Sequence, residues 1–142
     1  MIYTASRASS ALSTTNDTVT IICGASKTIR IKRIVFGFMG TASAANEIFI
    51  SRSTGGTTGG GAITPTPHAA EQPASGCTVY TTWSAQPTLN VTILRATLNA
   101  NGAVWVWVAT PGEEIILRNS EQLSIRSVSG TSSVVVDVTW EE

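Results

Sequence analysis

The feature that most limits the fold of this chain is an alternation of apolar and polar residues with a period of two. It is clearest at Ile29-Arg30-Ile31-Lys32, where isoleucines and basic side chains fall on opposite faces of an extended backbone. No stretch carries an apolar stripe at the 3.6-residue spacing of a helix. The sequence therefore predicts an all-β protein.

The strand-like segments follow one another closely, with turn residues between them. They are 18–23, 29–39, 47–52, 78–83, 91–98, 103–108, 115–118, 123–128 and 134–140. The alternation breaks at Arg33-Ile34, which predicts a β-bulge. The Asn-Gly segment 99–102 predicts a hairpin turn between 91–98 and 103–108. This spacing is typical of a jelly-roll-like β-sandwich of about eight or nine antiparallel strands.

A length of 142 residues suits one β-sandwich domain spanning 1–142. Two segments depart from the strand pattern. Residues 1–15 are rich in Ser and Thr, and we expect an N-terminal arm that adds a strand to a neighbouring subunit. Residues 54–76 combine glycines with Pro65 and Pro67, which predicts an extended Gly/Pro-rich surface loop in contact with a neighbouring molecule.

The low charge of the chain limits its partners. Charged residues make up 13% of the sequence, about half the usual share, and nine basic residues balance nine acidic ones. We expect no nucleic-acid partner, because such binding needs clustered positive charge. We also expect no membrane partner, because no apolar run approaches the roughly 20 residues of a membrane span. A surface with so few charges favours association with other protein subunits.

Little in the sequence suggests catalysis. His68 is the only histidine, so one subunit cannot build a histidine-based triad or a cluster of histidine ligands. Glu113-Glu114 and Glu141-Glu142 are adjacent carboxylates, but neighbouring strand residues point to opposite faces. The glycines of 54–61 lack the lysine and the following helix of a phosphate-binding loop. We predict no enzyme activity, no cofactor and no metal.

The cysteines and tryptophans each leave alternatives open. Cys23 and Cys77 are predicted to be buried free thiols, and a single bridge between two strands is the alternative. Trp105 and Trp107 share one strand face, where they either form a platform for sugar rings or pack in a core or subunit interface, which we favour. Segment 103–108 is apolar on both faces, which indicates a central strand or one covered by a partner.

Several features occur in a distinctive order. They are Ser51-Arg52-Ser53 running into a Gly-rich stretch, Ile63-Thr64-Pro65-Thr66-Pro67, an Ala/Pro-rich segment, Tyr80-Thr81-Thr82-Trp83-Ser84-Ala85-Gln86-Pro87-Thr88, Val104-Trp105 and Pro111-Gly112-Glu113-Glu114-Ile115-Ile116-Leu117. In this order, over roughly Glu47 to Trp140, the chain resembles the small head-decoration (cement) proteins of tailed bacteriophages. It departs from them at His68-Ala69-Ala70, where an acidic segment is common, and the first 40 residues carry no resemblance.

The resemblance implies a jelly-roll subunit, usually trimeric, that binds the outside of a phage head. We therefore expect a structural virion protein, made in the host cytoplasm, with itself and the major capsid protein as partners. Several weak contacts per trimer would add up to firm binding. The alternative function is a carbohydrate- or receptor-binding β-sandwich module of a phage tail or appendage. The residues expected at a capsid or subunit interface are Thr64, Pro65, Thr66, Pro67, His68, Trp83, Trp105 and Trp107.

Overall fold

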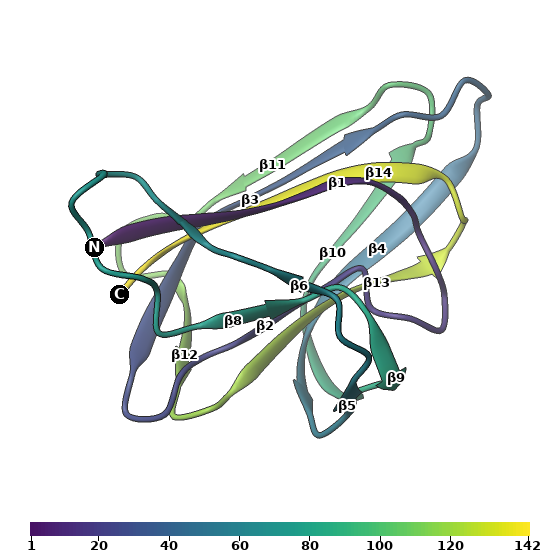
Figure 1. The fold of residues 1–142 in the computed structure, drawn as a ribbon. Coiled ribbons are helices and arrows are strands. Elements are labelled where there is room, and N and C mark those ends of the chain that lie inside the picture. The colour runs from purple at the N-terminus through teal and green to yellow at the C-terminus, as the bar shows by residue number, and fades with distance from the viewer.

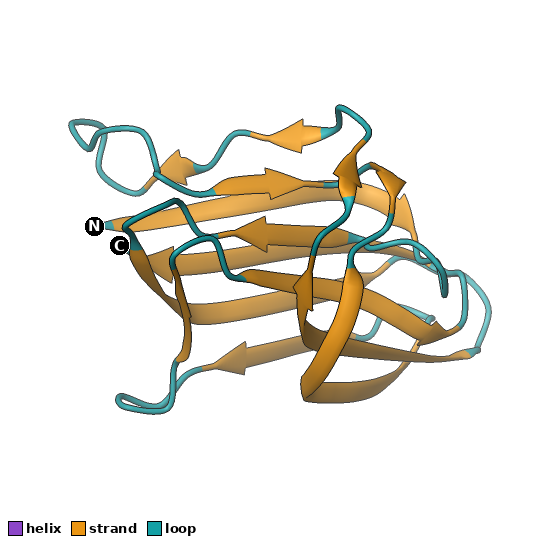
Figure 2. Ribbon diagram, turned by 90° about the horizontal axis from the view of Figure 1, so that it is seen from below, coloured by secondary structure: helices purple, strands orange, loops and turns teal.

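The computed structural model describes residues 1–142, and every regular element in it is a β-strand. It contains no helix, and so none that could span a membrane. The strands are layered in sheets, as Figures 1 and 2 show. In chain order they are β1 (Ile2–Ala11), β2 (Val19–Ile22), β3 (Thr28–Phe38), β4 (Ala45–Thr54), β5 (Thr57–Thr58), β6 (Ala62–Ile63), β7 (Thr66–Pro67), β8 (Thr78–Tyr80), β9 (Trp83–Ala85), β10 (Thr88–Asn99), β11 (Val104–Val108), β12 (Ile115–Arg118), β13 (Gln122–Ser129) and β14 (Ser133–Glu141).

Two six-stranded sheets form the body of the protein. The first sheet has the order β11-β3-β14-β1-β7, and β12 also pairs with β3. The second sheet has the order β10-β4-β13-β2-β8-β6, and β5 and β9 form a separate pair. The pairings between strands are antiparallel. The prediction of an all-β sandwich of antiparallel strands is confirmed.

One apolar core of 24 buried residues draws on both sheets. The alternation in the sequence supplies it: in β3, Ile34, Phe36 and Phe38 are buried, while the residues between them are partly exposed. Each such side chain contributes about 1.5–3 kcal/mol when it leaves water. Trp140 of β14 is fully buried and stacks on Tyr3 of β1, with 6.2 Å between the ring centroids.

The break in the alternation of β3 is a β-bulge at Lys32. The neighbouring strand β14 pairs Thr139 with Arg33 and Trp140 with Ile31, so Lys32 is an additional residue. The bulge lets the apolar residues on both sides of it face the core. The predicted bulge is confirmed, one residue earlier than the sequence indicated.

The first residues of the chain do not form a free arm. β1 pairs with β14 along most of its length, and Tyr3 and Ala5 are buried in the core. The two ends of the chain lie side by side, where the amino group of Met1 donates to the carbonyl of Glu142 at 2.8 Å (Figure 1). The prediction of an arm over 1–15 is therefore wrong for β1. The physical reason is that β1 satisfies its backbone hydrogen bonds on β14 of its own sheet, while Tyr3 and Ala5 fill the inner face.

The Asn-Gly segment 99–102 does not make a hairpin. β10 pairs with β4 in the second sheet, whereas β11 pairs with β3 in the first. Gly102 has a φ of 70°, which glycine adopts easily, but Asn101 does not have the positive φ that an Asn-Gly hairpin turn also requires. The segment instead crosses between the sheets beside the β3–β4 connection, and the Ala100 N–H donates to the Ala44 carbonyl at 2.8 Å. The predicted hairpin is wrong, because β10 and β11 belong to different sheets. Segment 103–108 is not a central strand, because β11 is at the edge of its sheet, and the alternative that a partner covers its second face stays a prediction.

The two cysteines are buried, unbridged thiols, as predicted. The β2–β8 register ends with Ile22 opposite Thr78, and Cys23 and Cys77 are the next residues along each chain segment. Burial raises the pKa of both thiols, that of Cys77 to about 12. At neutral pH almost no thiolate is present, so both cysteines serve as small core residues.

Candidate interaction surfaces

One edge of the sandwich is covered by residues 62–68, which we call the strap. Its first strand, β6, pairs with β8 of the second sheet, and its second strand, β7, pairs with β1 of the first sheet. The strap therefore runs from one sheet to the other across their shared edge (Figure 1). Exposed sheet edges present unpaired backbone groups that promote unwanted association, and the strap pairs with such groups at Tyr3 and Thr4 of β1 and at Val79 and Tyr80 of β8.

The strap has an inner and an outer row of side chains. Ile63, Pro65 and Pro67 are half-buried, whereas Thr64, Thr66 and His68 are exposed. The predicted contact residues Thr64, Thr66 and His68 thus form one outward row, while Pro65 and Pro67 face the protein. The expectation of an extended surface segment holds here, and its contact with a neighbouring molecule stays a prediction.

His68 fixes the end of the strap to the first sheet. Its backbone N–H donates to the Ile2 carbonyl at 2.9 Å. Its ring Nε2 lies 2.7 Å from the Thr4 hydroxyl, which lies 3.0 Å from the Thr139 hydroxyl. The segment is therefore bound to its own subunit through side-chain and backbone contacts.

The glycine-rich residues before the strap pack around Trp83. Gly56 has a φ of 89°, and a Cβ atom on it would lie 2.7 Å from the Trp83 ring. A Cβ on Gly61 would lie 2.4 Å from the Thr82 hydroxyl. These glycines permit the close approach that lets β5 pair with β9.

Trp83 is an internal anchor and not an exposed contact residue. It is 9% exposed, and its indole N–H donates to the Thr20 hydroxyl at 3.0 Å. The ring packs edge-on against Tyr80, with centroids 5.6 Å apart. The expectation that Trp83 lies at a capsid or subunit interface is not supported by this placement.

A buried ion pair lies behind Trp83. The Asp17 carboxylate accepts hydrogen bonds from Thr20 at 2.7 Å, from the Arg126 Nε at 2.7 Å and from the Ser124 hydroxyl. The Asp17 side chain is fully buried and that of Arg126 is 12% exposed. This network joins β2, β13 and the segment around β9. Sequence reasoning missed it, because Asp17 and Arg126 are 109 positions apart and share no motif.

The tryptophans of β11 face inward. Trp105 and Trp107 are half-buried and pack against the core, and Trp105 lies against Phe36 with 5.4 Å between the centroids. This arrangement agrees with the favoured core interpretation. It does not present the two rings together as a flat exposed platform for sugars.

The opposite face of β11 is apolar and exposed. Val104, Val106 and Val108 are 66%, 51% and 63% exposed. They alternate with the tryptophans, so the same strand that fills the core also presents three valines to solvent. The sequence indicated this surface, because segment 103–108 is apolar on both faces. Folding packs the tryptophan face on the core and leaves the valine side chains exposed.

One member of each adjacent carboxylate pair meets Lys32. The Lys32 ammonium lies 2.9 Å from Glu114 and 3.0 Å from Glu141. Hydrogen bonding to Lys32 lowers the pKa of Glu114 to about 2 and also lowers that of Glu141. Hydrogen bonds to the two carboxylates raise the pKa of Lys32. The cluster is thus an ion-pair triad that ties the β-bulge to β14 and to the segment before β12.

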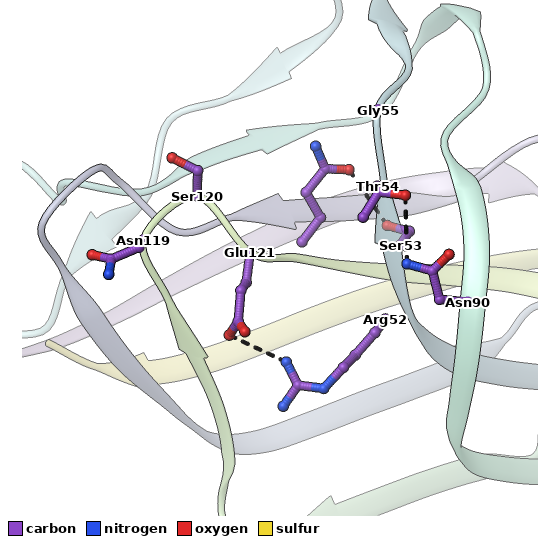
Figure 3. Close-up of a pocket in the computed structure, with 9 residues that line it drawn as sticks. Arg52, Ser53, Thr54, Gly55, Asn90, Asn119, Ser120 and Glu121 are labelled. Carbon is purple, nitrogen blue, oxygen red and sulfur yellow. Dashed lines mark hydrogen bonds and ion pairs between the residues drawn. The ribbon is translucent and has the colours of Figure 1, made fainter.

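A polar hollow of about 300 Å³ lies where β4 ends and β10 begins, beside the turn between β12 and β13 (Figure 3). Arg52 reaches across it to Glu121 at 3.2 Å and also donates to the Ile116 carbonyl at 2.9 Å. Asn90 donates to Thr54 at 3.4 Å. The charged groups in the hollow are therefore already paired within the chain. No group of three or more His, Cys, Asp or Glu residues is placed to bind a metal ion.

No protein-family model matches this sequence, and no curated protein matches it at a level that indicates homology.

Proposed function

We propose that this chain is a structural virion protein, a homotrimeric decoration (cement) protein of the jelly-roll type that binds the outside of a phage head. The proposal rests on the resemblance over residues 47–140. The observation that supports it most is the arrangement of the sandwich edges. One edge is covered by the strap, and the other ends in the uncharged, exposed strand β11.

The strand order supports the jelly-roll part of the proposal. β11 and β12 both pair with β3, and we count them as one position at the edge of the first sheet. The eight principal positions then lie as β1-β14-β3-β11 in one sheet and β2-β13-β4-β10 in the other. Successive strands change sheets at each step except from β4 to β10, which are neighbours. Two interleaved Greek keys produce this order.

The surface chemistry supports binding to other proteins. With 13% charged residues and no net charge, the chain has little electrostatic repulsion against packing in a dense protein layer. The outward row Thr64, Thr66 and His68 is extended and contains no Lys, Arg, Asp or Glu, and it suits contact with a capsid surface. Each subunit would make a weak contact, and three linked contacts would bind much more firmly than one.

The test is the protein composition of purified virus particles. Quantitative mass spectrometry of particles from the phage that encodes this chain should find it in fixed proportion to the major capsid protein. Removal from intact particles should require conditions that also destabilise the head. Particles that contain no trace of the chain after purification would refute the proposal.

The carbohydrate-binding alternative is less well supported. It was based on the pair Trp105 and Trp107, whose rings pack on the core. A glycan array with the purified chain separates the two functions, because the decoration protein should bind no glycan on it.

A further inference from the structure

The outer face of the first sheet carries a continuous apolar surface at its open edge. Val104 is opposite Gly37, and Val106 is opposite Val35. On the other side of β3, Gly37 is opposite Val135. We call this surface the valine face; its residues are Val35, Val104, Val106, Val108 and Val135. The three valines of β11 are more than half exposed, and contiguous exposed apolar patches are typical of interaction sites.

The edge next to the valine face has none of the features that normally prevent association. β11 contains only valine and tryptophan, without a charge, a proline or a bulge. At the opposite edge of the same sheet, the strap covers β1 at Tyr3 and Thr4. The contrast indicates that one edge is protected within the subunit and the other is left for a partner.

An unpartnered carboxylate lies in the middle of this face. Asp137 is opposite Val35 in β14 and alternates with the buried residues Val136 and Val138, so it lies on the outer face. Its Oδ1 atom is buried and has no hydrogen-bond partner. The Asp137 carboxylate forms no ion pair within the chain, so it is free to pair with a cation from a partner.

The face also carries the matching cation. Arg33 is opposite Val108 on one side and Thr139 on the other, and it is exposed. It lies two residues from Val35 along β3 and forms no ion pair within the chain. The same face thus holds one free guanidinium, one unpartnered carboxylate and a strip of exposed valines.

We propose that the valine face binds a second copy of this chain, with Arg33 of one copy paired to Asp137 of the next. A surface that carries both an unpaired acid and an unpaired base can pair head to tail, with Arg33 of each copy bound to Asp137 of the next, and such a contact closes into a ring when it is repeated around a threefold axis. Where valines meet valines in this contact, no polar side chain is left unpaired. This inference rests on the proposed function, for which it would supply the subunit interface of the homotrimer.

The first experiment measures mass by light scattering behind size exclusion, over a range of concentrations. We compare the wild-type chain with Val106→Lys, at the centre of the face, and with Val91→Lys, a valine 62% exposed on β10 of the other sheet. In Val106→Lys, the introduced ammonium groups of neighbouring copies would repel one another and would lose water in the contact, which opposes association. Val106→Lys should therefore raise the dissociation constant at least about 100-fold, whereas Val91→Lys should leave it within about threefold. A wild-type monomer, or equal behaviour of the two variants, would overturn the proposal.

The second experiment tests the charge pair. Arg33→Glu and Asp137→Lys should each weaken association, and the double variant Arg33→Glu/Asp137→Lys should restore it, with circular dichroism confirming that all three fold. A double variant as weak as the sum of the single changes would refute the pairing.

Binding to purified heads separates this inference from the proposed function. If Val106→Lys is monomeric and the wild-type oligomer still fails to bind heads, the interface stands and the decoration function fails. If the wild-type chain is monomeric and Val106→Lys abolishes head binding, the valine face contacts the capsid and the inference of a second copy is wrong.

Discussion

Replacing Asp17 with alanine should destabilise the fold by about 3–5 kcal/mol, because it leaves the Arg126 guanidinium in a largely buried site without its counter-ion. The Asp17 side chain is fully buried and that of Arg126 is 12% exposed, so water can replace little of the lost interaction. The hydroxyls of Thr20 and Ser124 lose an acceptor as well. Ser124 can donate to the Ser53 hydroxyl instead. Thr20 has no such replacement, because the Trp83 indole N–H is itself a donor to the Thr20 hydroxyl, so this buried hydroxyl is left without an acceptor and the loss should lie at the upper end of the range.

This loss is a large part of the 5–15 kcal/mol that holds a typical domain folded. It is measured by urea denaturation of all variants at one protein concentration, because association itself contributes to apparent stability. With a slope of about 1–3 kcal/mol per molar urea, the midpoint should fall by about 1 M or more. The double variant Asp17→Ala/Arg126→Ala should cost less than the sum of the single variants, since it leaves no unpaired buried charge.

The matched control is Glu71→Ala, an exposed acid without a hydrogen bond or ion pair, which should change stability by less than about 0.5 kcal/mol. An Asp17→Ala variant that loses less than about 1 kcal/mol would refute the reasoning. Additive costs of the Asp17 and Arg126 changes would also refute it, because they would show that the two side chains do not act as a pair.

Lys32→Met should lower the melting temperature at pH 7 and flatten its acid dependence. Glu114 has a folded-state pKa of about 2 against an ordinary 4.5, so its stabilising effect is present above pH 4.5 and is lost as the pH falls towards 2. If the melting temperature of Lys32→Met depended on pH between these values as that of the wild type does, the ion pair would not contribute to stability. Cys23 and Cys77 should react with Ellman's reagent only as the protein unfolds, because burial suppresses the thiolate; fast reaction of the native protein would show the core to be open. Thr4→Val should increase hydrogen exchange in the strap while the sandwich stays folded, because it removes the hydroxyl bonded to the strap histidine, and peptide-resolved exchange equal to wild type would count against that anchor.

The sequence predicted what depends on local alternation. The inward positions of β3, including the bulge beside Arg33, could be read because isoleucine, phenylalanine and basic residues differ so strongly in their transfer energies. The same alternation indicated that segment 103–108 has two apolar faces. The outer one of these faces carries Val104, Val106 and Val108 of the valine face.

What the sequence could not predict depends on pairing between distant strands. The partner of β1 is β14, more than 100 positions away, and the Ser, Thr and Ala side chains of β1 have too little apolar contrast to indicate a strand. Gly102 has the positive φ expected in such a turn, yet the strands on either side of it pair with β4 and β3. Turn chemistry fixes a local backbone conformation, and the rest of the sheet decides which strands become neighbours.

The candidate interface residues show the same difference between local sequence and distant contacts. Thr64, Thr66 and His68 were expected at the surface from their Pro-rich context, and they lie there. Trp83 was expected at an interface, but its indole N–H finds a buried acceptor in Thr20, a contact that bridges 63 positions. An aromatic residue in a short strand carries no local sign of whether its ring will meet the core or a partner.

Co-sedimentation of the purified chain with expanded phage heads that lack it tests the decoration function most directly. The account predicts saturable binding, with a plateau of three chains per binding site on the shell and with bound heads that resist heat better than bare heads. Heads that sediment without the chain at saturating concentration, while the chain itself is folded and oligomeric, would contradict it.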